Sequence, residues 1–199
     1  MDEITSGWRL TAGGAHQLFG LEPDIAVFAK GMSNGYPMAA IIGKKDVMEV
    51  FQQTFVSSTY WTERIGPVAA MATIKKIVSA KVPQHLNKIG KKIKNGWQVL
   101  AKKHGISIHI GGIDPLAHFT FEHQEPLVLK TLFTQEMLKR GFLANTAFYV
   151  SFAHKEPHIK KYLKAVDEVF GIISKAQTSG DPGKYLEGPV AHAGFKRLT

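Results

Sequence analysis

The stretch Pro23-Asp24-Ile25-Ala26-Val27-Phe28-Ala29-Lys30 places a lysine at the end of a short apolar run. Residues 25–28 predict a buried strand, and the Gly- and Ser-containing residues 31–35 predict a flexible turn beside the lysine. An amine held there is partly desolvated, which disfavours its ammonium form and favours attack on a carbonyl to form a Schiff base. The commoner alternative for a lysine is a strand-end side chain that reaches out to water.

An acidic pair, Asp2-Glu3, lies 30 − 2 = 28 positions upstream of Lys30. Several unlike segments surround the two sites in a fixed order, namely Asp2-Glu3-Ile4-Thr5-Ser6-Gly7-Trp8-Arg9, Gly13-Gly14-Ala15, Phe19-Gly20-Leu21-Glu22-Pro23-Asp24-Ile25, Ala29-Lys30-Gly31 and Asn34-Gly35-Tyr36-Pro37. In order and spacing they resemble the class III aminotransferases, which are pyridoxal-phosphate (PLP) enzymes of fold type I. The resemblance runs from Asp2 to about Ala176. Within the family, Trp8-Arg9 and residues 13–17 are most similar to the glutamate-1-semialdehyde 2,1-aminomutase branch.

The resemblance assigns a task to each matched residue near Lys30. It implies that Lys30 holds the cofactor as an internal aldimine and later acts as the general base. It implies that Asp2 faces the pyridine nitrogen and keeps it protonated, so that the ring accepts electrons. Ile4, two residues on, is expected on the same side of a strand as Asp2, where the resemblance implies that it packs against the ring. The alternatives are a solvated N-terminal acid for Asp2 and an ordinary core residue for Ile4.

A second matched segment, Ser57-Ser58-Thr59-Tyr60-Trp61-Thr62-Glu63-Arg64, precedes a helical pattern that begins at Gly66. By resemblance, Thr59 contacts the cofactor phosphate of the neighbouring subunit. A hydroxyl suits this task because it donates a hydrogen bond to a phosphate oxygen without adding charge. The alternative is a hydroxyl that caps a turn or helix. The cross-subunit role implies a homodimer as the active unit.

The implied fold is an α/β, fold type I PLP-dependent transferase, made of part of the parallel-rich sheet of the large domain and an α+β C-terminal small domain. We expect residues 1–82 in the large domain, 83–104 in a connecting helix, 105–176 in the small domain and 177–199 in an irregular tail. Family members carry roughly two hundred further residues before the acidic pair, judged by the size of such a subunit. The N-terminal half of the fold, with its phosphate-binding turn and ring-stacking aromatic residue, is therefore expected to be missing.

Apolar periodicity predicts the individual elements. Helices are expected at 45–51, 66–80, 83–103, 126–140 and 156–175, and strands at 25–28, 107–110, 116–122 and 148–152. In the longest helix the apolar residues recur at spacings of three and four, which predicts one buried face.

Composition excludes several classes of protein. The chain has 199 residues, 44% of them hydrophobic, and no cysteine, so disulfides, thiol catalysis and cysteine-ligated metals are excluded. No run of about 18 apolar residues predicts a membrane span, and no signal peptide is recognised. We therefore expect a cytoplasmic protein. The pairs His104/His109 and His118/His123 lack the spacing of the helical zinc motif, so no metal site is predicted.

The charge needs an explanation of its own, because 25 basic residues face 16 acidic ones, for a net charge of +9. Many lysines lie in residues 83–104 and 155–164, where the wet face of an amphipathic helix accounts for them. A nucleic-acid patch is disfavoured, since only four arginines occur and specific base readers rely on arginine. A catalytically silent basic domain that binds an acidic partner remains the alternative to the enzyme.

The resemblance also bears on the substrate, a small amino acid or amino aldehyde. Aminotransferases that use 2-oxoglutarate commonly hold its carboxylate with an arginine. Arg140 is the only arginine between Arg64 and Arg197, and its position at a helix end predicts a solvent-facing side chain. This favours an aminomutase-like reaction over intermolecular transamination, unless Arg9 or an upstream region supplies the contact.

Overall fold

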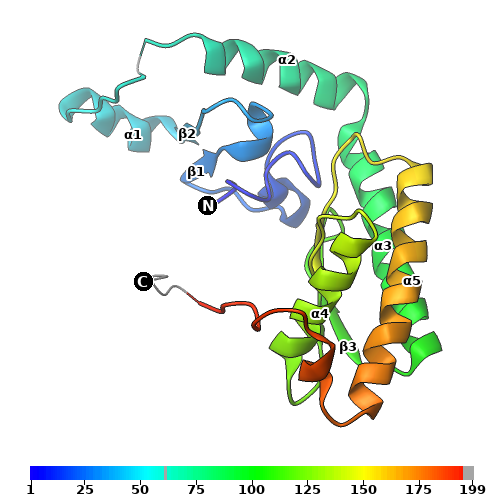
Figure 1. Cartoon of the computed structure of the whole chain (residues 1–199). Coiled ribbons are helices and arrows are strands. Elements are labelled where there is room, and N and C mark those ends of the chain that lie inside the picture. The colour runs from blue at the N-terminus through cyan, green and yellow to red at the C-terminus, as the bar shows by residue number, and fades with distance from the viewer. Residues whose placement is uncertain (61, 195–199) are drawn as a thin grey trace. The chain divides into compact units, whose positions relative to one another are not determined.

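The computed structural model describes residues 1–60 and 62–194, and the chain divides into two units, Met1–Asn87 and Lys88–Thr199 (Figure 1). Trp61, which belongs to the second matched segment, and the last five residues of the predicted tail lie outside the described residues. Among the described residues, each helix is too short or too polar to traverse a lipid bilayer.

The first unit is built on a small sheet. Strand β1 (Ile25–Phe28) pairs antiparallel with β2 (Ala40–Gly43), in a register that places Ile25 opposite Gly43. On its other side β1 forms a parallel bridge between Val27 and Asp2. Short 3-10 helices cover Ala15–Phe19, Lys30–Met32 and Glu49–Gln53, and the α-helices are α1 (Lys45–Met48) and α2 (Ile65–Ser79).

The core of this unit lies on one side of β1. Ala26 and Phe28 alternate along the strand and pack with Met32 and Ala70, while Trp8 adds a partly buried ring. This alternation is the period-two pattern of a strand with one buried face. Residues 1–3 are thereby held beside the strand whose end carries Lys30.

The second unit is an antiparallel sheet of order β3-β4-β5, made of Ile108–Gly111, Leu116–Phe121 and Ala147–Tyr149. Helix α3 (Val82–His104) leads into it, and α4 (Pro126–Lys139) and α5 (Glu156–Thr178) complete it. A 3-10 helix at Pro182–Tyr185 follows α5.

Phe119 of β4 is the centre of this unit's core. Its ring lies edge-on to Trp97 of α3 at 4.9 Å, Phe133 of α4 at 5.4 Å and Phe170 of α5 at 5.9 Å, measured between centroids. The three helices therefore cover the same face of the sheet. Edge-to-face aromatic pairs are worth about 0.5–1.5 kcal/mol each beyond the area they bury.

The predicted elements are present, with differences at short or terminal segments. The predicted helix 45–51 is a single α-helical turn followed by a 3-10 helix. The predicted strand 148–152 ends at Tyr149, because the chain turns where the Ser151 N–H donates to His154 Nδ1. Helix α5 runs to Thr178, three residues beyond its predicted end.

The segment after α5 is less irregular than predicted. Its 3-10 helix is tied to α4, since the Gln135 amide donates to the Tyr185 carbonyl and accepts from the Glu187 N–H. These bonds satisfy backbone groups that a free tail leaves to water. The predicted domain bounds themselves stay a prediction.

Candidate active site

Lys30 follows β1 directly and opens the 3-10 helix Lys30–Met32. Its backbone is left-handed, with φ of 47°, and its Nζ donates a hydrogen bond to Thr5 Oγ1 at 2.7 Å. The side chain is exposed, so the predicted partial desolvation is wrong. Strand alternation would send Lys30 to the buried side occupied by Ala26 and Phe28, but the left-handed turn takes it out of that alternation. The amine is held by a hydroxyl and not by burial.

Asp2 lies beside β1, at the level of Val27 and three residues before Lys30 (30 − 27 = 3). The bridge consists of the Glu3 N–H donating to the Val27 carbonyl at 2.9 Å and the Val27 N–H donating to the Met1 carbonyl at 3.0 Å. The Asp2 side chain is exposed, as a carboxylate that faces a ligand must be.

Ile4 does not share a strand face with Asp2, and that prediction is wrong. Residues 4–9 form a turn, and the Ile4 N–H donates to Asp2 Oδ1 at 2.9 Å. An aspartate side chain that captures a backbone N–H two residues on offers the chain an alternative to the sheet. Ile4 is half-buried in this turn.

Thr59 is exposed in the turn that precedes α2. Exposure is required of a hydroxyl that reaches a ligand or another subunit. The cross-subunit phosphate contact itself stays a prediction.

Two bulky residues of the site have left-handed backbones, Trp8 at φ of 67° and Lys30 at 47°. Such conformations are uncommon outside glycine and cluster at functional sites. Trp8 packs on Phe28 with centroids 5.8 Å apart, and its indole N–H is buried without an acceptor among residues 1–60 and 62–194. Buried donors normally have a partner, so this indole N–H is a second unusual feature of Trp8, after its left-handed backbone.

Glu3, for which the sequence suggested no task, is the most buried charged group of the first unit, with 1% of its surface exposed. Burial alone would raise its pKa, but hydrogen bonds from Ser6, from the backbone of His16 and Ala15 and from the His16 ring lower the pKa to about 2. The carboxylate is therefore ionised in the folded chain at neutral pH. The position of Glu3 next to Asp2 in the matched segment is the sequence feature that could have indicated its importance.

Arg140 does not project into solvent, contrary to the prediction. Its Nη1 donates to Glu136 Oε2 and its Nε to Glu168 Oε2, both at 3.0 Å. Burial would raise the pKa of Glu136, but hydrogen bonds from Lys139, Gln135 and Arg140 lower it. Arg140 is thus occupied by carboxylates of its own unit, because both acids lie within its reach on α4 and α5.

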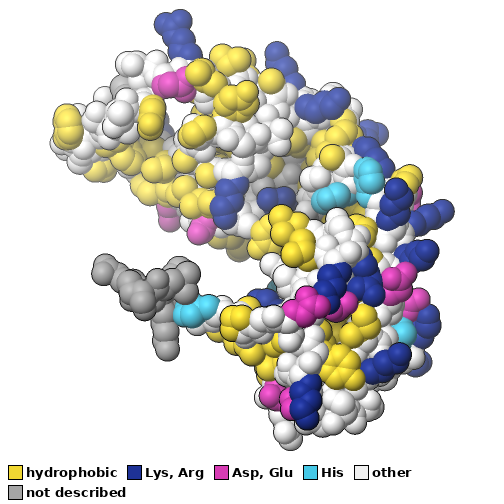
Figure 2. Space-filling view, viewed as in Figure 1, with side chains coloured by type: hydrophobic (Ala, Val, Ile, Leu, Met, Phe, Trp, Pro, Cys, Tyr) yellow, Lys and Arg dark blue, Asp and Glu magenta, His cyan; other side chains and the backbone are white. Residues whose placement is uncertain are grey.

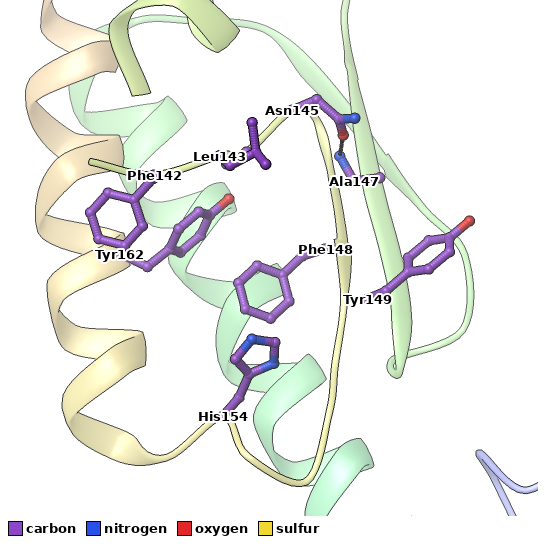
Figure 3. A pocket seen from close by; sticks show the side chains of 9 residues that line it. Phe142, Leu143, Asn145, Ala147, Phe148, Tyr149, His154 and Tyr162 are labelled. Carbon is purple, nitrogen blue, oxygen red and sulfur yellow. Dashed lines mark hydrogen bonds between the residues drawn. The ribbon is translucent and has the colours of Figure 1, made fainter. Parts of the chain in front are cut away.

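The second unit holds a cavity of about 270 Å³ that the sequence did not reveal (Figure 3). Phe148 packs between His154 and Tyr162, with ring centroids 4.9 and 5.0 Å away. Burial raises the pKa of Tyr162, whose hydroxyl accepts from the Trp97 indole N–H at 3.1 Å. The cavity is lined by residues of the second unit, namely Phe142, Leu143, Ala144, Asn145, Ala147, Phe148, Tyr149, His154 and Tyr162.

Within the part of the chain that the structure describes, His, Asp and Glu side chains do not gather in threes around a possible metal position. His118, one of the histidines considered above, lies on β4 and is exposed.

The family model that matches this chain is "Aminotransferase class-III", over residues 1–148. A 3-aminobutyryl-CoA aminotransferase of Cloacimonas acidaminovorans is 28% identical over 180 residues, which cover 87% of this chain and 44% of the relative. A glutamate-1-semialdehyde 2,1-aminomutase of Clostridium kluyveri is 30% identical over 187 residues, covering 83% of this chain and 44% of the relative. The chain thus spans less than half the length of these curated relatives.

Solved structures agree with the predicted fold class. FumI of Sphingopyxis sp. MTA144, in its PLP internal aldimine form, superposes with a TM-score of 0.83 at 22% identity, over 89% of this chain and 44% of that one. The ornithine aminotransferase of Toxoplasma gondii gives a TM-score of 0.78 at 17% identity, over 89% and 43%. The likeness confirms the α/β fold of the fold type I transferases over that portion.

Proposed function

The chain belongs to the class III aminotransferases, and from this premise we propose that it contributes Lys30, Asp2 and Thr59 to PLP-dependent transfer of an amino group. The observation that carries the proposal is the position of Asp2 beside Val27, three residues before Lys30 on the same small sheet. A carboxylate and a primary amine are thus presented from neighbouring backbone segments, and both side chains are exposed.

The residues present fit the cofactor. A primary amine is needed to attach its aldehyde with loss of water, and the exposed Lys30 supplies one. Asp2 accepts one backbone N–H through Oδ1, which leaves acceptor capacity for a protonated ring nitrogen. The Thr59 hydroxyl is exposed and able to donate to a phosphate. When bound, the cofactor supplies an electron sink for the carbon that loses a proton.

Each of the site residues has a specific role in this proposal. Lys30 would hold the cofactor through Nζ, and the same amine would take and return the substrate proton. Asp2 keeps the ring nitrogen protonated through its carboxylate. Thr5 holds Lys30 Nζ through its hydroxyl, and Ile4 supplies apolar surface beside Asp2.

Substrate and assembly belong to the whole protein and are proposed at that level. We propose a small amino acid or amino aldehyde as substrate and a homodimer in which Thr59 serves the neighbouring subunit. An aminomutase-like reaction is supported by the relative from Clostridium kluyveri and by Arg140, which already binds Glu136 and Glu168.

The test is to add PLP to the purified chain and record the visible absorbance of lysine-bound cofactor. We expect a band that Lys30→Ala abolishes and that Lys44→Ala keeps, since Lys44 is an exposed lysine of the same unit paired with Asp24. Borohydride reduction followed by peptide mass spectrometry should place the cofactor on residue 30. Attachment spread over several lysines, or no band at all, would contradict the proposal for this chain.

A second candidate function, a basic domain that binds an acidic partner, is supported by the distribution of charge. Residues 88–199 carry 17 Lys and Arg and 9 Asp and Glu, 17 − 9 = 8 of the net +9. Helix α3 has six lysines and no acid, and two of them, Lys92 and Lys103, are paired with acids of α5. Figure 2 shows dark blue side chains gathered along these two helices.

An acidic polypeptide such as poly-L-glutamate is the probe for this candidate. Binding that weakens as salt rises, and that the double variant Lys88→Glu/Lys91→Glu removes, would support it. Equal affinity for the variant would exclude this face, and tighter binding of RNA than of poly-L-glutamate would favour a nucleic-acid partner instead.

A further inference from the structure

Glu3 gathers three donors onto one buried carboxylate. Its Oε2 accepts from the Ser6 hydroxyl at 2.5 Å, and its Oε1 accepts from the His16 N–H and from His16 Nδ1, both at 2.9 Å. The backbone of Ala15 also lowers the pKa of Glu3. The side chain is completely buried, and that of His16 is 14% exposed. A buried carboxylate is stable only when its oxygens are satisfied in this way.

The backbone of Glu3 is engaged as well. Its N–H donates to the Val27 carbonyl of β1, and its carbonyl accepts from the Gly7 N–H at 2.9 Å. Glu3 therefore ties together three segments, namely β1, the turn at residues 4–9 and the start of the 3-10 helix Ala15–Phe19.

The space around these segments is closed. A Cβ on Gly7 would lie 2.7 Å from the Glu3 carbonyl and 2.7 Å from the Phe28 ring, and one on Gly14 would collide with the His16 ring. Gly7 is needed because the turn approaches β1 more closely than a side chain permits, and at Gly14 the His16 ring already fills the space. The turn and the start of the 3-10 helix therefore have little freedom to shift.

The turn held by Glu3 carries the groups that face Lys30. Thr5, two residues on, accepts from Lys30 Nζ at 2.7 Å, and its carbonyl accepts from Arg9 Nε at 2.9 Å. Asp2 immediately precedes Glu3, and its carboxylate is fixed by the Ile4 N–H. Displacing Glu3 would therefore displace a neighbour of Lys30 and the carboxylate of Asp2 together.

We propose that Glu3 is a positioning residue for Lys30 and Asp2, acting through the Ser6 and His16 contacts that fix the turn carrying Thr5. This inference rests on the proposed function of Lys30. Two acceptor oxygens are needed, because donors approach both Oε1 and Oε2. Glutamine offers one oxygen and one NH₂ group. In Glu3→Gln the NH₂ group therefore faces either Ser6 or His16, which donate to the carboxylate of Glu3 and would lose their acceptor.

The test measures the reactivity of Lys30 in the chain without cofactor, by limited acetylation and peptide mass spectrometry. Loss of one hydrogen bond of ordinary strength changes an equilibrium about fivefold. We expect Glu3→Gln and Thr5→Val each to raise Lys30 acetylation about fivefold relative to exposed Lys45. Lys44, paired with Asp24, serves as the internal reference for an intact first unit. The matched control is Glu22→Gln, an exposed acid of the same unit, which should leave Lys30 unchanged.

A second readout uses the bound cofactor. The pH midpoint of its visible band should move in Glu3→Gln and stay in place in Glu22→Gln, whereas a purely structural role would alter only the melting temperature. If Glu3→Gln does not fold, Ser6→Ala removes one donor and should raise Lys30 acetylation in the same direction. Unchanged acetylation in folded Glu3→Gln or Ser6→Ala would overturn the inference. Failure of every variant and of the unmodified chain to bind PLP would overturn the proposed function, while the acetylation result would still decide the role of Glu3.

Discussion

Acid should weaken the folded chain through Glu3, and the size of the effect follows from its pKa. Hydrogen bonds lower the folded-state pKa from 4.5 to about 2, a difference of roughly 2.5 units. At 1.36 kcal/mol per unit, the ionised carboxylate contributes about 3 kcal/mol to the free energy of unfolding. Because the folded pKa is the lower one, this contribution is fully present above about pH 5.5 and is lost as pH falls from 4.5 towards 2. About 1 kcal/mol remains at pH 3 on the same relation.

The assay is urea unfolding of the chain and of Glu3→Gln at several values between about pH 3 and pH 7, followed by circular dichroism. The difference between their free energies of unfolding should shrink by about 2 kcal/mol over this range. Other acids with lowered pKa values, such as Asp24 and Asp167, are common to both proteins and cancel. A difference that stays constant from pH 7 to pH 3 would refute the reasoning.

Three further substitutions test the second unit by urea or thermal unfolding. Phe119→Ala should lower the free energy of unfolding by about 3–5 kcal/mol, because its fully buried ring is the centre of the aromatic core. A loss below about 1 kcal/mol would exclude that role. Gly90→Ala should destabilise by several kcal/mol, since the added methyl would collide with the Asp114 carbonyl, and an unchanged midpoint would show that the backbone yields there. Arg140→Met should cost about 1–3 kcal/mol by removing a donor from the nearly buried Glu136, and wild-type stability would indicate that Lys139 suffices.

The long elements could be predicted from sequence because a single pattern specifies each of them. In α3 the apolar residues recur at spacings of three and four, and Leu86, Ile93 and Trp97 are buried while Leu100 is half-buried. In β4 strict alternation places Ala117, Phe119 and Phe121 inward. Such periodicity is a property of the segment itself, so it needs no knowledge of its neighbours.

The ends of several elements were predicted less well because local side-chain hydrogen bonds decide where they lie. Strand β5 stops at Tyr149, where the imidazole of His154 captures the backbone N–H of Ser151. Helix α5 continues to Thr178, whose hydroxyl donates to the Ser174 and Lys175 carbonyls. Side-chain bonds of this kind compete with regular structure and leave no periodic trace in the sequence.

The candidate site was likewise predictable from sequence only in part. Lys30, Asp2 and Thr59 could be assigned roles only through the family resemblance, since each has an ordinary alternative in isolation. The contacts that hold the site join residues distant in sequence, such as Glu3 with His16 and Thr5 with Lys30, 13 and 25 positions apart. No local pattern encodes pairs of that separation, and so the role of Glu3 emerged only from the fold.

The left-handed turn at Lys30 explains why local rules fail where the chemistry is proposed. Continued strand geometry would direct residue 30 to the side of Ala26 and Phe28, and an amine buried there would cost several kcal/mol. The conformation with φ of 47° costs about 1–2 kcal/mol instead, and it releases the amine to Thr5. A residue without a Cβ would adopt this backbone more easily but would carry no amine. The strain is therefore the smaller of two costs, and the proposed role of the Lys30 amine explains why glycine does not occupy this position.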